Sequence, residues 1–184
     1  LRRYNFNTGI ELSCVSDLPA RSGLGSSSAL IVGLINALNA LDGRVSSKNF
    51  LTNEAIEIEQ NILKETVGSQ DQTACAHGGF NKISFLNDGG ITVSPIILKQ
   101  DRKAELNDHL MLFFTGFSRF ASDVAKSQVA NINRKKEELI RMLEMVDEAI
   151  AILTSDQDIR EFGKLLDYSW KTKRTLSNLI SNSE

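Results

Sequence analysis

Apolar positions recur along the first third of the chain with two different spacings. Between residues 10 and 15 apolar and polar positions alternate, which predicts a half-buried strand. From Leu30 to Leu38 a leucine returns at every fourth position, which predicts a helix, and Gly43 is a candidate C-cap for it. A second helix is expected to follow Ser46-Ser47, whose hydroxyls can cap it, and to extend over Thr52–Glu65.

The middle of the chain carries the signals of a hairpin. Apolar runs at residues 80–86 and 91–97 flank the sequence Asn87-Asp88-Gly89-Gly90, and an Asp-Gly turn between two such runs predicts two antiparallel strands. Before the hairpin, a short helix is expected to open at Asp71. After it, the apolar run His109–Phe114 is expected to be a further strand.

The pattern changes after Gly116, where strand signals end. Residues 121–153 predict one long helix or two, and residues 156–180 predict another. We therefore expect two domains: a mixed domain of helices and strands over residues 1–118, and the start of a second, mostly helical domain over residues 119–184. Acidic and basic residues are interleaved in this second part, which is typical of a solvent-exposed helix surface.

Composition narrows the classes of function. The chain has 184 residues and a formal net charge of -2, whereas nucleic-acid-binding domains usually carry a clear basic excess, so no nucleic acid partner is expected. No apolar run reaches the ~20 residues of a membrane helix, and no membrane partner is expected either. The two cysteines, Cys14 and Cys75, favour reduced thiols in a cytoplasmic protein. Because the chain begins with Leu1 and shows no signal-peptide pattern, we expect a piece truncated at both ends.

The stretch from Pro19 to Ser28 is the strongest chemical signal. Gly23 and Gly25 let backbone amides approach a ligand closely, and the residues after them open a helix whose N-terminus carries unpaired donors and the positive end of the dipole. Such a site suits the phosphates of a nucleotide. The loop has neither the lysine of a Walker A loop nor a Gly-x-Gly-x-x-Gly fingerprint, and a Gly/Ser-rich helix cap without a ligand is the alternative.

The pattern Pro-x-x-x-Gly-Leu-Gly-Ser-Ser-Ser-Ala at residues 19–29 resembles the second signature of the GHMP kinases, the family of galactokinase, homoserine kinase, mevalonate kinase and phosphomevalonate kinase. The resemblance implies an α+β fold with a ribosomal-protein-S5-like N-terminal domain and the helices of a ferredoxin-like C-terminal domain. It also implies that the loop binds ATP and that Ser27 ligates Mg²⁺. The candidate ATP contacts are Pro19, Gly23, Leu24, Gly25, Ser26, Ser27 and Ser28.

A second segment carries the carboxylates that a Mg²⁺-dependent transfer would use. Mg²⁺ takes one or two carboxylates as ligands, and Thr52–Glu65 offers four glutamates, of which Glu59 lies at the edge of the apolar stripe. By composition alone, each of them is more often a solvent-facing surface residue than a metal ligand. Residues 67–72 resemble the Gly-x-x-Asp-Gln segment of galactokinase-type members. That resemblance implies Asp71 as the catalytic carboxylate and the glutamate twelve residues earlier, Glu59, as the second Mg²⁺ ligand.

Further similarity narrows the substrate. The segments Gly78–Asn81 and Leu112–Ala121 resemble the bacterial heptose kinase branch of the family, which phosphorylates the anomeric hydroxyl of D-glycero-D-manno-heptose 7-phosphate. A salt-bridged surface residue is the alternative interpretation of Arg119. The candidate substrate contacts are Gln70, Gln72, Gly79 and Arg119.

The resulting hypothesis is an ATP- and Mg²⁺-dependent phosphotransferase that forms a sugar 1-phosphate from a small-molecule sugar or sugar phosphate, with a homodimer as a candidate assembly. A fucokinase- or galactokinase-like kinase is one alternative, and a non-catalytic sugar sensor on the same fold is another. The presence of both Glu59 and Asp71 disfavours the sensor. A helical interaction module in the C-terminal half is a third alternative. Cys75 and His77 resemble half of a zinc site, but the sequence offers no second such pair, so core packing is expected.

Overall fold

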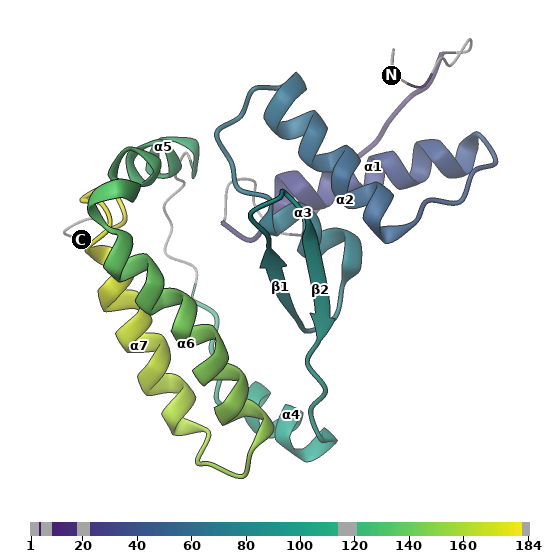
Figure 1. Ribbon diagram of the computed structural model, residues 1–184. Helices are drawn as coiled ribbons and strands as arrows, with labels where there is room; N and C mark the ends of the chain where they lie inside the picture. Colours follow the sequence, from purple (N-terminus) through teal and green to yellow (C-terminus); the bar gives the residue numbers. More distant parts are fainter. Residues whose placement is uncertain (1–3, 5–8, 18–22, 114–120, 182–184) are drawn as a thin grey trace. The chain divides into compact units, whose positions relative to one another are not determined.

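The computed structural model describes residues 4, 9–17, 23–113 and 121–181 of the chain (Figure 1). Helices and a two-stranded antiparallel sheet make up the described part, which agrees with the expected α+β class. The elements in chain order are α1 (Ser26–Leu41), α2 (Lys48–Ile56), the π-helix η2 (Glu57–Ile62), α3 (Gln70–His77), β1 (Asn81–Phe85), β2 (Ile91–Pro95), α4 (Gln100–Asp108), α5 (Ala121–Asn131), the 3₁₀-helix η3 (Ile132–Arg134), α6 (Lys136–Thr154) and α7 (Arg160–Arg174).

The chain divides into two units of contacts. The N-terminal unit contains α1, α2, η2 and α3 and ends at Gly78, and the C-terminal unit contains the remaining elements and begins at Gly79. These units are groups of residues in mutual contact, so the domain boundary expected at residue 118 stays a prediction.

The helices of the N-terminal unit pack around one apolar cluster. Its buried members are Val32 and Ile35 of α1 and Leu51 and Ala55 of α2. Spacings of three and four residues place each pair on one face of its helix, so the two helices can bury these faces together. Cys75 packs against the same cluster from α3. This core therefore packs α1, α2 and α3 against one another.

Local sequence sets the helix ends in this unit. Gly25 is the N-cap of α1 with a φ of 71°, and Gly43 follows the end of α1 with the same φ of 71°. Positive φ values favour glycine because it has no Cβ. The Ser47 hydroxyl accepts a hydrogen bond from the backbone N–H of Phe50 at 3.1 Å and caps α2. The predicted cap at Ser47 is confirmed, whereas the C-cap of α1 is Asp42 and Gly43 is the left-handed residue directly after it.

The second predicted helix is confirmed, but its last part is not a regular α-helix. α2 continues directly into η2, whose turns are wider than those of an α-helix. The helical segment ends at Ile62 instead of Glu65, and Lys64 follows it with a φ of 56°. A 3.6-residue period does not foresee a π-helix, because each wide turn shifts all later side chains around the helix axis.

The predicted hairpin is confirmed. β1 and β2 pair antiparallel, with Ile83 opposite Val93, and the predicted Asp-Gly turn connects them. Gly89 has a φ of 84°, which suits a residue without Cβ. The Asp88 carboxylate accepts a hydrogen bond from the backbone N–H of Gly90 at 2.8 Å and so stabilises the turn.

Two predicted strands are wrong within the described residues. Residues 10–15 form no strand there, and Val15 is 94% exposed. Residues 109–113 form no strand either, and Phe114 lies outside the described residues. A strand satisfies its backbone groups through a partner, and β1 and β2 are the strands that pair in the described part. The helix α4, which precedes residues 109–113, was not predicted. It buries no side chain, and its sequence shows no apolar period that would indicate a helix.

The C-terminal unit contains the expected helices, but the last one, α7, begins at Arg160 and ends at Arg174, inside the predicted range of residues 156–180. The expected first helix is divided into α5, η3 and α6, and α6 packs against α7. The buried apolar side chains of this helical region are Met145, Leu153, Ile159, Leu176 and Ile180.

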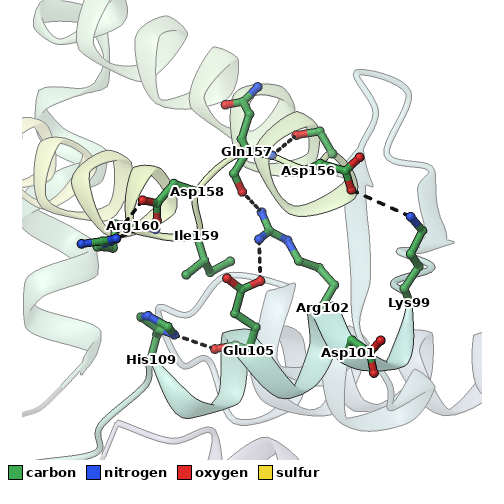
Figure 2. A pocket seen from close by; sticks show the side chains of 11 residues that line it. Lys99, Asp101, Arg102, Glu105, His109, Asp156, Gln157, Asp158, Ile159 and Arg160 are labelled. Carbon is green, nitrogen blue, oxygen red and sulfur yellow. Dashed lines mark hydrogen bonds and ion pairs between the residues drawn. The ribbon is translucent and has the colours of Figure 1, made fainter.

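Arg102 of α4 joins that helix to the connection between α6 and α7 (Figure 2). Its guanidinium donates to the carbonyl oxygens of Ile152 at 2.8 Å, Leu153 at 3.3 Å and Gln157 at 2.7 Å. It also donates to the Glu105 carboxylate at 2.7 Å. Carbonyls at a helix C-terminus lack partners inside the helix, so Arg102 caps the end of α6.

Candidate functional site

The phosphate loop and the start of α1 are the first part of the candidate site. Gly23 and Gly25 have φ values of 76° and 71°, and Gly25 leads directly into α1 at Ser26. The first backbone N–H groups of a helix have no intrahelical acceptor and carry the positive end of its dipole. Leu24, between the two glycines, is 50% exposed. Gly23, Gly25 and the start of α1 thus have the backbone features of an anion site, and phosphate binding stays a prediction. Pro19 lies outside the described residues.

Glu59 of η2 accepts hydrogen bonds from two serine hydroxyls at the start of α1. The Ser27 hydroxyl donates to Glu59 Oε1 at 2.9 Å, and the Ser28 hydroxyl donates to Glu59 Oε2 at 2.9 Å. Glu59 is 3% exposed and Ser28 is 4% exposed, whereas Ser27 is exposed. A carboxylate buried to this extent requires hydrogen-bond donors, and the helix start supplies them.

Glu59 lies on η2, in line with the buried face of α2. α2 buries Leu51 and Ala55 in the apolar cluster, and Glu59 continues that spacing by four residues. η2 begins at Glu57, so the buried face of α2 ends in a carboxylate where the helix widens. Such wide turns are frequent at functional sites.

Gln72 of α3, which follows Glu59 in the chain, donates to the same carboxylate as the two serines. Its side-chain Nε2 donates to Glu59 Oε2 in a short hydrogen bond. Gln72 is 1% exposed, and its other side-chain atom, Oε1, is buried without a hydrogen-bond partner in the described structure. Glu59 thus accepts from Ser27, Ser28 and Gln72 together.

Asp71 lies next to the loop on the residue before Gln72. It is exposed, and a Cβ placed on Gly25 would stand 3.5 Å from Asp71 Oδ2. The absence of a Cβ at Gly25 therefore keeps a space open between the loop and this carboxylate. Position 71 is also in the first turn of α3, where a negative charge interacts favourably with the helix dipole.

Cys75 reports the same concentration of negative charge. Burial raises the pKa of the Cys75 thiol, and the charges of Asp71 and Glu59 raise that pKa further. The Cys75 Sγ lies 4.0 Å from the backbone oxygen of Gly25. The pKa of this thiol therefore depends on the charges of Asp71 and Glu59, and its sulfur lies beside the loop.

The donor set fits Mg²⁺ bound together with a nucleotide. Mg²⁺ prefers oxygen ligands and is usually held by one or two carboxylates plus phosphate oxygens and water. Ser27 Oγ and Glu59 Oε1, 2.9 Å apart, offer one hydroxyl and one carboxylate oxygen beside the phosphate loop. Among the described side chains, no cluster of three or more His, Cys, Asp or Glu offers a complete protein-only metal site.

The structure brings together Ser27, Ser28, Glu59, Asp71 and Gln72 with the loop from Gly23 to Ser26. Of the other candidates, Gln70 is exposed at the start of α3, Gly79 belongs to the C-terminal unit, and Arg119 lies outside the described residues.

Sequence reasoning missed one relationship, the hydrogen bond from Gln72 to Glu59. The available signal was that Gln72 directly follows Asp71 on α3. Neighbouring side chains of a helix point in different directions, so when Asp71 is exposed Gln72 can face the helices packed against α3.

Comparison with known proteins relates the N-terminal part of the chain to a kinase family. Residues 1–79 match the family of GHMP kinases N terminal domains. A D-glycero-alpha-D-manno-heptose 7-phosphate kinase of Campylobacter jejuni is 32% identical over 94% of this chain and 51% of that protein. An L-fucokinase/L-fucose-1-P guanylyltransferase of Bacteroides fragilis is 27% identical over 95% of this chain and 19% of that protein.

Solved structures include a close fold match. The crystal structure of a D-glycero-D-manno-heptose 1-phosphate kinase from Bacteroides thetaiotaomicron matches with a TM-score of 0.65 and 28% identity, over 86% of this chain and 46% of that one. This chain thus spans about half the length of the heptose kinases that it matches. The resemblance to the GHMP kinases and the α+β fold class are confirmed. Across the described residues, no helix combines the length and apolar character that a bilayer crossing requires.

Proposed function

Starting from an N-terminal region that belongs to the GHMP kinase N-terminal domain family, we propose that the protein is an ATP- and Mg²⁺-dependent sugar kinase. The proposed reaction transfers the γ-phosphoryl group of ATP to the anomeric hydroxyl of a heptose 7-phosphate. The single observation that carries the proposal is the meeting of Ser27, Glu59 and Asp71 at one phosphate loop. A helix cap without a ligand would need none of these carboxylates.

Nucleotide and metal binding are assigned to the loop and to Glu59. The backbone amides from Gly23 to Ser28 bind the phosphates, with Pro19, Leu24 and Ser26 completing the loop's contacts. Ser27 Oγ and Glu59 hold Mg²⁺. The ion would neutralise charge on the phosphates of ATP. Ser28 donates a hydrogen bond to the other carboxylate oxygen of Glu59 and holds its position.

Asp71 is assigned to the acceptor hydroxyl. It orients the attacking oxygen and takes its proton as the new O–P bond forms and the bond from the γ-phosphorus to the β-γ bridging oxygen breaks. Its exposure next to Gly25 leaves the carboxylate accessible to a substrate. Gln70, Gly79 and Arg119 remain proposed substrate contacts.

The choice of heptose rests on the relatives. One similar protein is named a heptose 7-phosphate kinase, and one similar structure is named a heptose 1-phosphate kinase. A fucokinase is also similar to this chain. A fucokinase-like activity is therefore the second candidate. A non-catalytic sugar sensor is disfavoured because a sensor has no need for a metal carboxylate and an acceptor carboxylate at one loop. Both kinase candidates use ATP and a small sugar, which is consistent with a cytoplasmic enzyme; a homodimer is the proposed assembly.

A coupled ADP-release assay of the complete gene product tests the proposal. The panel contains heptose 7-phosphate, the unphosphorylated heptose, fucose and galactose, each with and without Mg²⁺. Mg²⁺-dependent turnover with heptose 7-phosphate is expected. Turnover confined to fucose or galactose would select the alternative kinase, and no turnover with any sugar would contradict the catalytic proposal. Asp71→Asn is expected to abolish turnover while ADP affinity stays within about threefold, because the carboxylate acts on the acceptor and not on the phosphates.

A further inference from the structure

The two oxygens of Glu59 have different surroundings. Oε2 accepts from two buried donors, the Ser28 hydroxyl and the Gln72 amide. Oε1 accepts from Ser27, whose side chain is exposed. The buried side of the carboxylate is therefore saturated with hydrogen bonds, and the other oxygen is directed to the solvent-accessible start of α1.

Gln72 carries an unusual cost for a buried side chain. It is 1% exposed, yet its Oε1 has no hydrogen-bond partner in the described structure. A buried acceptor without a partner destabilises the folded state, and an apolar side chain of similar volume would avoid that cost. Packing alone therefore does not explain a glutamine at this position, whereas the hydrogen bond from its Nε2 to Glu59 does.

We propose that Gln72 is a positioning residue that holds Glu59 Oε2 so that Oε1 faces the metal beside Ser27. This inference rests on the proposed function, because it assigns Glu59 to Mg²⁺. A glutamine suits the task since it donates a hydrogen bond but brings no positive charge, which leaves the full charge of the carboxylate for the cation. The near-complete burial of Gln72 separates this role from the direct substrate contact that the sequence predicts for it.

The test compares Gln72→Met and Gln72→Leu with Thr73→Val in the complete gene product. Thr73 is the neighbouring buried residue, 0% exposed, and its hydroxyl donates only to the backbone oxygen of Ser69 at 2.6 Å. Calorimetry measures ADP affinity with Mg²⁺ and with EDTA, and thermal unfolding is followed without ligands. We expect both Gln72 variants to lose roughly tenfold of the Mg²⁺-dependent gain in ADP affinity. Their affinity in EDTA should stay within about twofold, because the amide acts only through Glu59.

Stability and sugar kinetics separate positioning from a structural role. The unfolding temperatures of both Gln72 variants are expected to stay close to that of the wild type, because removal of the orphan acceptor offsets the loss of one hydrogen bond to the buried Glu59. The sugar KM is expected to stay unchanged. An unchanged Mg²⁺ dependence, a raised sugar KM with intact Mg²⁺ dependence, or loss of folding in both variants would each overturn the inference.

Failure of the proposed metal site would be seen in the wild-type protein, whereas failure of the positioning role would be seen in the Gln72 variants. If wild-type protein binds ADP equally well with Mg²⁺ and with EDTA, the metal assignment of Glu59 fails and the role of Gln72 fails with it. If the wild type shows the Mg²⁺ dependence and the Gln72 variants retain it in full, only the positioning role fails. Thr73→Val is expected to keep the Mg²⁺ dependence of the wild type, and an equal loss in this variant would show that any change in the α3 core has the same effect.

Discussion

The Ser27 hydroxyl donates to Glu59 Oε1 at 2.9 Å although 32 residues separate them in the chain. The contact joins the start of α1 to the π-helix that follows α2. It places a hydroxyl and a carboxylate oxygen within the reach of a single cation at the end of a phosphate loop. The metal assignment for this chain depends on that pair.

Replacement of Glu59 tests the metal assignment. Glu59→Gln keeps the shape of the side chain and can still accept hydrogen bonds, but it removes the charge that attracts a cation. We expect Mg²⁺-dependent ADP affinity and turnover to fall on the order of 100-fold. Glu57→Gln is the matched control, since Glu57 lies on the same π-helix and pairs with Asn61 in an exposed position. An equal loss in both variants would argue against a specific role for Glu59.

Two glycines of the loop and its helix are expected to respond in opposite directions to alanine. Gly25→Ala places a Cβ on a residue with a φ of 71° and fills the space facing Asp71, so the free energy of unfolding should fall by roughly 1 kcal/mol and ADP affinity should weaken. Gly33→Ala lies in the exposed interior of α1 with no atom within 4 Å of the added Cβ, and it should stabilise the protein by about 0.5–1 kcal/mol. Urea unfolding and ADP titration check both. A stabilising Gly25→Ala would contradict the loop conformation.

The raised pKa of Cys75 predicts slow alkylation near neutral pH. A thiol reacts as the thiolate, so the iodoacetamide rate at Cys75 should rise with pH above the ordinary thiol range. Asp71→Asn removes one of the charges that raise this pKa, and it should therefore accelerate alkylation of Cys75 at a fixed pH in EDTA. Mass spectrometry measures both cysteines, and the exposed Cys14 is the internal control. Equal Cys75 rates in wild type and variant would contradict the proximity of Asp71.

Arg102 is expected to matter for stability and not for the site. Arg102→Met leaves the carbonyls of Ile152, Leu153 and Gln157 without their donor, which should lower the unfolding free energy of the C-terminal unit by roughly 1–3 kcal/mol. Trp170, the one tryptophan of the sequence, lies on α7 and reports this unit by fluorescence. Lys103→Met, on the exposed face of the same helix, should change stability little. Mg²⁺-dependent ADP binding should stay unchanged in both variants.

Features that depend on neighbouring residues could be predicted from the sequence. The cap at Ser47, the left-handed Gly43 and the Asp-Gly hairpin follow from local turn and helix-end chemistry. The spacing between Glu59 and Asp71 also led to two carboxylates that lie near the same loop, although their assignment came through resemblance to a family.

Features that depend on distant partners could not be predicted. The alternation at residues 10–15 is not sufficient for a strand, because a strand also needs a second segment that pairs with its backbone. α4 lacks an apolar face, so its polar sequence gave no period to detect. The direction of the Gln72 amide depends on the packing of α3 against α2 and on the position of Glu59 in the helical segment that continues α2.

A crystal structure of the complete gene product with ADP and Mn²⁺, which scatters anomalously and replaces Mg²⁺, tests the central claim most directly. The account predicts an anomalous peak bonded directly to Ser27 Oγ and Glu59 Oε1 at about 2.1–2.2 Å, with ADP phosphates on the loop from Gly23 to Ser28. It also predicts that Gln72 and Ser28 still donate to Glu59 Oε2. A metal ion bound to the nucleotide but remote from both Ser27 and Glu59 would contradict the account.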